Sequence, residues 1–142
     1  IGRLFDLLNE ARMKAREIMR DGANYLNEGN FEAARKRFQE AIAIDAKIPE
    51  AYNGVGVTYR MRNELTDALV WYKKALELAP DFGDAYYNMA CLYALQDKDE
   101  MALRYLKIAA ANGYVSAEGL DTDSDLASLR DSQDYQALLK KM

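Results

Sequence analysis

The chain has 142 residues, half of them apolar, which is enough for one domain with a buried core. Its formal net charge is −4, and residues 81–142 carry eleven acids against six bases, which argues against a duplex nucleic-acid-binding protein. The lack of histidine excludes a Ser-His-Asp or Cys-His catalytic arrangement, one cysteine excludes an internal disulfide, and no apolar run is long enough to span a membrane.

The N-terminal segment from Ile1 to Tyr25 is predicted to be one long helix. No proline interrupts it, and its apolar or small residues follow the three-four spacing of a single helical stripe. The stripe comprises Ile1, Leu4, Phe5, Leu8, Ala11, Ala15, Ile18, Met19, Gly22 and Tyr25.

A pattern of small, aromatic, small, bulky and small residues recurs every 34 positions. The columns hold Gly22, Tyr25, Ala34, Phe38 and Ala41, then Gly56, Tyr59, Ala68, Tyr72 and Ala75, then Ala90, Tyr93, Ala102, Leu106 and Ala109. Small residues let two antiparallel helices approach closely, and the large ones fill the remaining space. A fixed period with this alternation predicts an array of helical hairpins.

These columns, with Pro49 and Pro80 between the hairpins, resemble the tetratricopeptide repeat family over about residues 15–114. The resemblance implies an all-α, right-handed superhelical solenoid of three helix-turn-helix repeats: 15–48, 49–82 and 83–115. Residues 1–14 are then expected to form an N-terminal helical extension. The alternative is that Leu4, Leu8 and Ala11 belong to a truncated earlier repeat, which needs a turn near Arg12 and Met13.

After Ala111 the period ends, and residues 116–142 are predicted to form short capping helices. Ser116, Ser124 and Ser132 are good N-cap residues. Apolar residues of this segment are expected to cover the third repeat, namely Leu120, Leu126, Leu129, Tyr135, Leu138 and Leu139. The segment resembles the tail of prokaryotic members of the family, so a bacterial or archaeal origin and a natural C-terminus near Met142 are expected.

The sequence predicts no catalytic residues, cofactor or metal, and therefore no enzyme. Its glycines are isolated, so no phosphate-binding loop is indicated. The acids Asp121, Asp123 and Asp125 alternate, but they lack the central glycine and distant glutamate of a calcium loop and are interpreted as caps and solvated turns. Cys91 shares a column with Ala23 and Val57 and is expected to be a small buried or groove-lining residue.

The resemblance implies a concave groove lined by the first helix of each repeat. The residues predicted to bind a peptide there are Arg16, Met19, Arg20, Asn53, Val57, Arg60, Tyr87, Asn88 and Cys91. Asparagine amides suit a peptide backbone, arginines suit acids, and Met, Val and Tyr suit apolar side chains. The family's dicarboxylate clamp for chaperone tails is not expected, since Met19, Ala23, Gly54, Asp84 and Asn88 all depart from its pattern.

The predicted function is a non-catalytic adaptor that binds a protein or peptide partner and no nucleic acid. Two alternatives remain open: self-assembly into a homo-oligomer through the apolar residues 1–12, and a regulatory domain of a larger protein. A cytoplasmic location is expected, although a start at Ile1 leaves room for an upstream signal or anchor.

Overall fold

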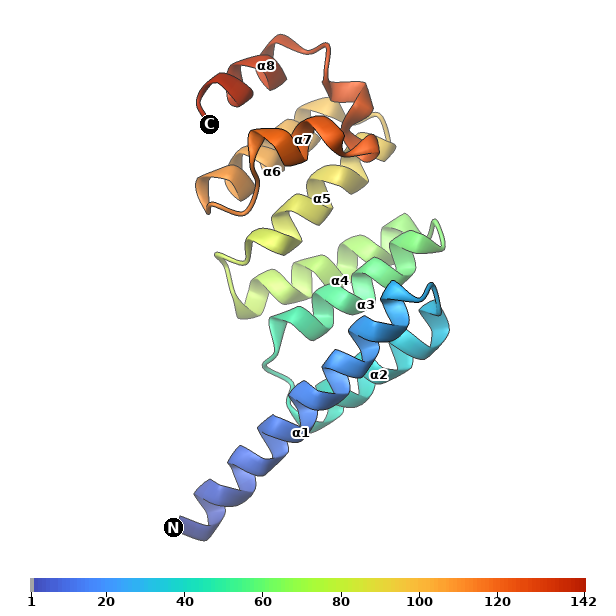
Figure 1. Cartoon of the computed structure of the whole chain (residues 1–142), viewed down its shortest axis with the longest axis vertical. Helices are drawn as coiled ribbons and strands as arrows, with labels where there is room; N and C mark the ends of the chain where they lie inside the picture. The colour runs from blue at the N-terminus through green and yellow to red at the C-terminus, as the bar shows by residue number, and fades with distance from the viewer. Residues whose placement is uncertain (1) are drawn as a thin grey trace. The chain divides into compact units, whose positions relative to one another are not determined.

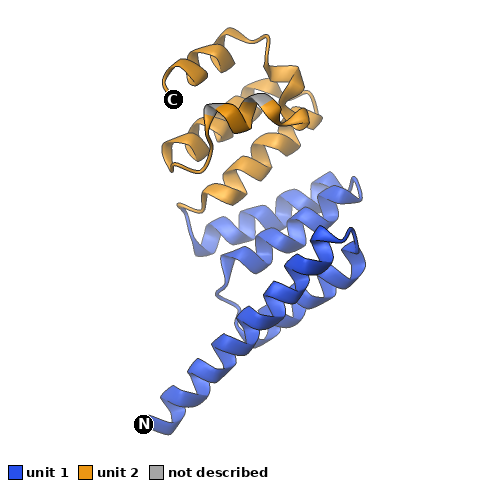
Figure 2. Ribbon diagram, viewed as in Figure 1, with its two compact units in different colours: residues 1–80 blue, residues 81–142 orange. Residues whose placement is uncertain are grey.

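Helices form all the regular secondary structure of residues 2–142, which the computed structural model describes apart from the side chains of Ala117 and Asp121. They fall into two compact units, unit 1 (residues 1–80) and unit 2 (residues 81–142) (Figure 2). The predicted class, an all-α array of helical repeats, is confirmed. Among these helices, none is both long and apolar enough to cross a bilayer.

Unit 1 consists of two helical hairpins (Figure 1). Helix α1 (Gly2–Asn27) pairs with α2 (Phe31–Ile44), and α3 (Pro49–Met61) pairs with α4 (Leu65–Leu78). Helix α3 also contacts α2 and α1. Helix α1 continues through Arg12 and Met13 without the turn that a truncated earlier repeat needs, and its first half extends beyond α2 (Figure 1).

Glycines set the close approach of these helices. A Cβ atom built on Gly22 would lie 2.9 Å from the ring of Phe38, and one on Gly54 would lie 2.7 Å from the same ring. On the next hairpin, a Cβ on Gly56 would lie 2.5 Å from the ring of Tyr72. Real Cβ atoms do not come this close to a ring, so each aromatic side chain occupies the space that a glycine leaves free.

The hairpin turns close through a residue with positive φ at the same place in each repeat. Gly29 has φ +79°, Asn63 has φ 61° and Asp97 has φ 59°. Glycine adopts this conformation freely, and Asn and Asp tolerate it better than other residues. This explains how the second and third turns keep their length without the glycine of the first.

Unit 2 contains the third hairpin and the C-terminal segment. Helix α5 (Gly83–Leu95) pairs with α6 (Asp99–Ala111), and the chain continues through α7 (Ala117–Thr122), the 3₁₀ helix η1 (Ser124–Leu129) and α8 (Gln133–Lys140). Helix η1 contacts both α5 and α6, and α8 contacts α6. Five of the apolar residues predicted to cover the third hairpin are buried: Leu120, Leu126, Leu129, Tyr135 and Leu138. The sixth, Leu139, is half-buried.

Two of the three predicted serine caps are confirmed and one is wrong. The hydroxyl of Ser116 accepts a hydrogen bond from the amide of Gly119, and that of Ser132 accepts one from Tyr135. The cap of η1 is Asp123 rather than Ser124, because a carboxylate of Asp123 reaches the amide of Asp125 at 2.9 Å. Ser124 is the first residue of η1 and is exposed.

Candidate interaction surface

Six of the nine predicted binding residues lie on α1 and α3, two helices that contact each other within unit 1. Arg16 and Arg20 of α1 are exposed. The other four are half-buried: Met19 on α1, and Asn53, Val57 and Arg60 on α3. We call this set of six residues the α1–α3 face. It combines two exposed guanidinium groups with half-buried apolar and amide groups and a third, half-buried guanidinium group.

Met19 serves the core as well as this face. It packs against one cluster of buried residues that includes Ala15 and Ile48, and against a second cluster that includes Phe38 and Val55. Its thioether is therefore held in place on one side by the hairpin interior. Only part of the side chain is available to a partner.

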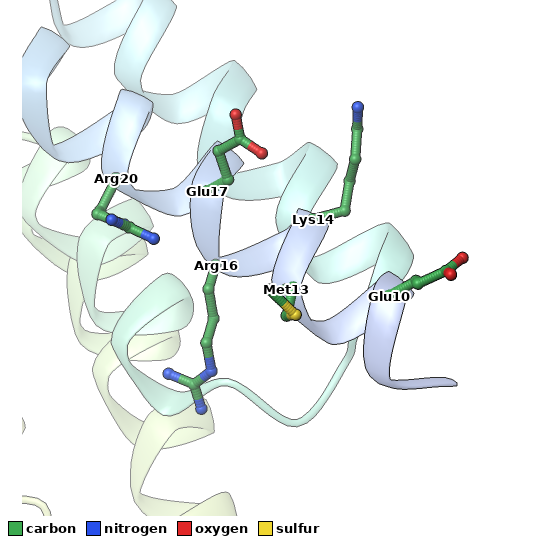
Figure 3. Close-up of a pocket in the computed structure, with 6 residues that line it drawn as sticks. All are labelled: Glu10, Met13, Lys14, Arg16, Glu17 and Arg20. Atoms are coloured by element: carbon green, nitrogen blue, oxygen red, sulfur yellow. The ribbon is translucent and has the colours of Figure 1, made fainter. Parts of the chain in front are cut away.

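The exposed side of α1 carries a surface pocket of about 550 Å³ (Figure 3). In the close-up, Arg16 points away from Lys14 and Glu17, which lie on the other side of the helix (Figure 3). The lining residues are Glu10, Met13, Lys14, Arg16, Glu17 and Arg20. Three cations and two anions give this pocket a small positive excess, and their exposure means that salt will screen it.

Arg35 of α2 positions α3. The repeat pattern in the sequence does not single out this residue. Its Nε donates a hydrogen bond of 3.0 Å to the hydroxyl of the buried Thr58, and its guanidinium lies 3.7 Å above the ring of Tyr59. The hydroxyl of Thr58 in turn donates to the carbonyl of Val55 at 2.6 Å. The hydrogen bond from Arg35 to Thr58 joins residues 23 positions apart, a spacing unrelated to the repeat.

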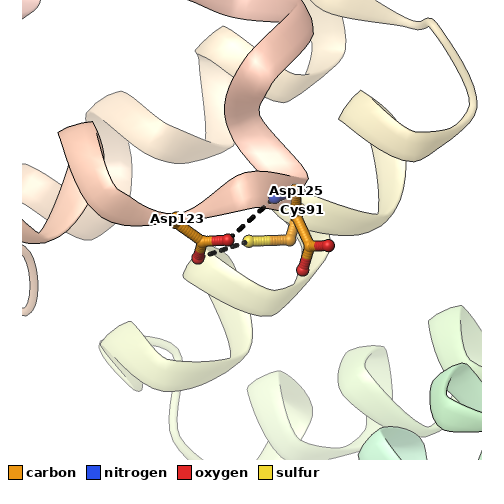
Figure 4. Close-up of side chains that lie close together, drawn as sticks. All are labelled: Cys91, Asp123 and Asp125. Carbon is orange, nitrogen blue, oxygen red and sulfur yellow. Dashed lines mark hydrogen bonds between the residues drawn. The ribbon is translucent and has the colours of Figure 1, made fainter.

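In unit 2, the predicted residues Tyr87 and Cys91 of α5 both contact Asp123 of the C-terminal segment. Figure 4 shows Cys91 beside Asp123 and Asp125. The Tyr87 hydroxyl donates a hydrogen bond to the carboxylate of Asp123, and the Sγ atom of Cys91 lies 3.8 Å from the same oxygen. Tyr87 also packs edge-on against Tyr114, with ring centroids 5.7 Å apart. Cys91, expected to be either buried or groove-lining, is 3% exposed and therefore buried. The third predicted residue of α5, Asn88, is half-buried.

Burial raises the pKa of the Tyr87 hydroxyl above its usual value, and the hydrogen bond to Asp123 raises this pKa further. Both effects disfavour the phenolate, because it would lose hydration and lie beside a carboxylate. The backbone around Asp123 is fixed by Arg130, which donates to the carbonyls of Asp123 at 2.6 Å and Leu120 at 3.3 Å.

The thiol of Cys91 and the carboxylates of Asp123 and Asp125 have ligand atoms within 4.8 Å of one another. One oxygen of Asp123 accepts the amide of Asp125, and the other accepts Tyr87 and Cys91. The carboxylate of Asp123 thus caps η1 and ties that helix to α5, which agrees with the interpretation of Asp123 as a cap; the side chain of Asp121 lies outside the described part of the chain. We call this arrangement of Tyr87, Cys91 and Asp123 the cap latch.

Comparison with protein families gives one match within the chain. A family model described as TPR repeat matches residues 56–97, from the middle of α3 to the turn after α5. Two curated relatives are each 28% identical. The Photosystem I assembly protein Ycf3 of Cyanophora paradoxa matches over 96 residues (65% of this chain, 55% of that protein), and the tetratricopeptide repeat domain-containing protein PYG7 of Arabidopsis thaliana matches over 93 (63% and 31%). The chain spans between 19% and 55% of the length of the curated relatives it matches.

Solved structures share the fold. MamA superimposes with a TM-score of 0.72 at 18% identity, over 89% of this chain and 75% of that one. The TPR2B domain of yeast Sti1, solved in a complex with an Hsp70 peptide, gives a TM-score of 0.67 at 23% identity, over 92% of this chain and 99% of that one. At such identities the likeness establishes architecture, and function has to be argued from the residues of the site.

Proposed function

We propose that the chain, whose residues 56–97 match a TPR repeat model, is a non-catalytic scaffold of the tetratricopeptide repeat family that binds an extended peptide or a partner helix on the α1–α3 face. Proteins of this family are interaction scaffolds. The observation that carries the proposal is the direct contact between α1 and α3, which places six residues of suitable chemistry on neighbouring helices.

The chemistry of the α1–α3 face fits a peptide that is acidic in part and apolar in part. The guanidinium groups of Arg16 and Arg20 are exposed and can form charge-assisted hydrogen bonds with carboxylates. The amide of Asn53 can donate to and accept from a peptide backbone, and Val57 supplies an apolar contact. Because the long arginines lose side-chain entropy when bound, the half-buried residues are expected to contribute most to specificity.

The proposal rests on unit 1 because part of the predicted surface of unit 2 is occupied. Tyr87 and Cys91 contact Asp123 of the chain's own C-terminal segment, so a ligand would have to displace the cap latch to reach them. Asn88 stays a predicted contact. A partner that binds unit 1 needs no such displacement.

Peptides selected from a random library on the immobilised chain provide the probe. We expect Asn53→Ala to weaken their binding at least about tenfold, since a buried peptide group would lose its partner. Gln39→Ala on α2, an exposed amide outside the face, is the matched control. Equal affinities for the wild type and Asn53→Ala by calorimetry would refute binding at the α1–α3 face.

A further inference from the structure

The first half of α1 carries an apolar face that is open to solvent. Leu4 is 63% exposed, Phe5 62%, Leu7 50% and Leu8 49%. In the second half of the same helix, Ala15 and Gly22 are buried against the rest of unit 1. Four neighbouring large apolar side chains with about half or more of their surface exposed form the kind of patch that marks an interaction site.

Helical geometry shows that this face continues the one that packs in the hairpin. At about 100° per residue, Leu4, Phe5, Leu7 and Leu8 span an arc of about 160°. The centre of this arc points in nearly the same direction as Ala15 and Gly22. The face that α2 covers in the second half of α1 therefore extends about two turns further toward the N-terminus. Since a helix covers this face along the second half, another helix is the best-fitting partner for the exposed part.

We propose that the occupant is the same segment of a second copy, paired in an antiparallel arrangement about a two-fold axis near Asp6. In this register Leu4 of one chain lies opposite Leu8 of the other, and Phe5 lies opposite Leu7. Asp6 is on the far side of the helix and stays in water. The patch is thus complementary to itself, as an isologous interface requires.

Charge favours the antiparallel direction. Arg3 and Glu10 lie on the same flank of the apolar arc, and an antiparallel pair brings equal flanks together. Arg3 of each chain then lies beside Glu10 of the other, whereas a parallel pair brings unequal flanks together and separates Arg3 from Glu10. The first turn of α1 has no acidic residue, and the second chain's Glu10 would supply a negative charge at this positive end of the helix dipole.

The size of the patch predicts a weak and reversible dimer. Two patches of a few hundred Å² each bury less than the roughly 1,200 Å² at which stable interfaces begin. We therefore expect a dissociation constant in the micromolar range, roughly, rather than an obligate dimer. The pairing uses none of the residues of the α1–α3 face and does not depend on the function proposed for it.

Analytical ultracentrifugation of the full chain over a wide concentration range tests this pairing. The mass is expected to rise from monomer to dimer and no further, and Leu8→Glu is expected to keep the chain monomeric. Val70→Glu, at an equally exposed apolar site on α4 (47%), is expected to dimerise as the wild type does. Circular dichroism checks that both variants keep their helices. A mass that stays monomeric for the wild type, or that Leu8→Glu leaves unchanged, overturns the proposal.

A mixing experiment tests the register. Arg3→Glu and Glu10→Arg should each weaken self-association about tenfold, because each places two like-charged pairs in the dimer. Mixed in equal amounts, the two variants should recover the wild-type affinity as a heterodimer, since every pair is then opposite in charge. Failure of the mixture to associate better than either variant alone overturns the antiparallel register.

Binding to vesicles tests the other occupant of this face. Association of the wild type with phosphatidylcholine vesicles instead of with itself would show that a membrane covers the face and overturns the pairing.

Discussion

A few contacts between single residues decide how closely the helices of each hairpin approach. The ring of Tyr72 fills the space above Gly56, and the ring of Phe38 lies between Gly22 and Gly54. These pairs explain why small and bulky residues recur in the repeat pattern. They determine how the helices pack and do not indicate what the protein binds.

Gly56→Ala is expected to destabilise unit 1 by about 1–3 kcal/mol, because the new methyl group would lie 2.5 Å from the ring of Tyr72. The higher helix propensity of alanine, worth about 1 kcal/mol, offsets only part of this cost. Urea denaturation gives the free energy of unfolding. Gly2→Ala is the control, since nothing lies within 4 Å of a Cβ at that position. Equal stability of Gly56→Ala and the wild type would show that Tyr72 can move at no cost.

The half-buried hydroxyl of Tyr87 should make unit 2 sensitive to alkaline pH. Its pKa is raised in the folded state, mainly by burial and then by Asp123, so the stability it confers is present below the unfolded pKa of about 10. That stability is lost as the pH rises from about 10 through the folded pKa. We expect Tyr87→Phe to reduce the loss of stability above pH about 10. Denaturation curves for both chains on either side of this pH measure the effect, and parallel pH profiles would contradict it.

At the scale of the helices, the repeat period accounts for the hairpins and for their turns. It also fits the turns, since Gly29, Asn63 and Asp97 are spaced by the same 34 positions, and Asn63 and Asp97 replace glycine there because both tolerate positive φ. It could not predict the cap latch, since residues after Ala111 leave the period. The contact of Tyr87 with Asp123 joins residues 36 positions apart. Only the folded arrangement of α5 and η1 brings them together.

The choice of Asp123 over Ser124 as the cap of η1 has the same origin. Both are good capping residues in the sequence. Asp123 takes the position because its second carboxylate oxygen also accepts the hydroxyl of Tyr87, while Ser124 is exposed. The contact between Tyr87 and Asp123 thus determines which of two adjacent capping residues becomes the N-cap of η1.

Asp123→Ala is expected to lower the stability of unit 2 by about 1–3 kcal/mol, because it removes a helix cap and leaves the half-buried Tyr87 hydroxyl without its carboxylate. Hydrogen exchange should accelerate in η1 and α8 before it does in α1 and α2. Ser124→Ala is the neighbouring control and should change little. Equal exchange rates in both variants would show that the apolar residues alone hold the C-terminal segment.

For the whole molecule, the two proposals assign peptide binding to the α1–α3 face and self-association to the exposed apolar face at the start of α1. Self-association would present two copies of the α1–α3 face to a multivalent target, which increases avidity without any new contact. The sequence suggested both surfaces, but only the structure shows that Met19 is shared with the core and that Tyr87 is held by the cap latch.

This division predicts that Leu8→Glu will leave the affinity for a single soluble peptide unchanged. The same variant should bind less tightly to a surface that carries many copies of the peptide, because avidity requires the dimer. Surface plasmon resonance at low and high peptide density distinguishes the two cases. Equal loss at both densities would mean that Leu8 contacts the peptide itself.

The most direct test of the account is the affinity of library-selected peptides for two charge-matched double variants. Arg16→Glu with Arg20→Glu changes the α1–α3 face, whereas Lys36→Glu with Lys73→Glu makes the same change in net charge on α2 and α4, at exposed positions outside it. If the peptide binds on the α1–α3 face, the first variant is expected to bind at least about tenfold more weakly than the wild type, and the second is expected to bind as the wild type does. Equal affinities for the two variants would contradict binding on this face.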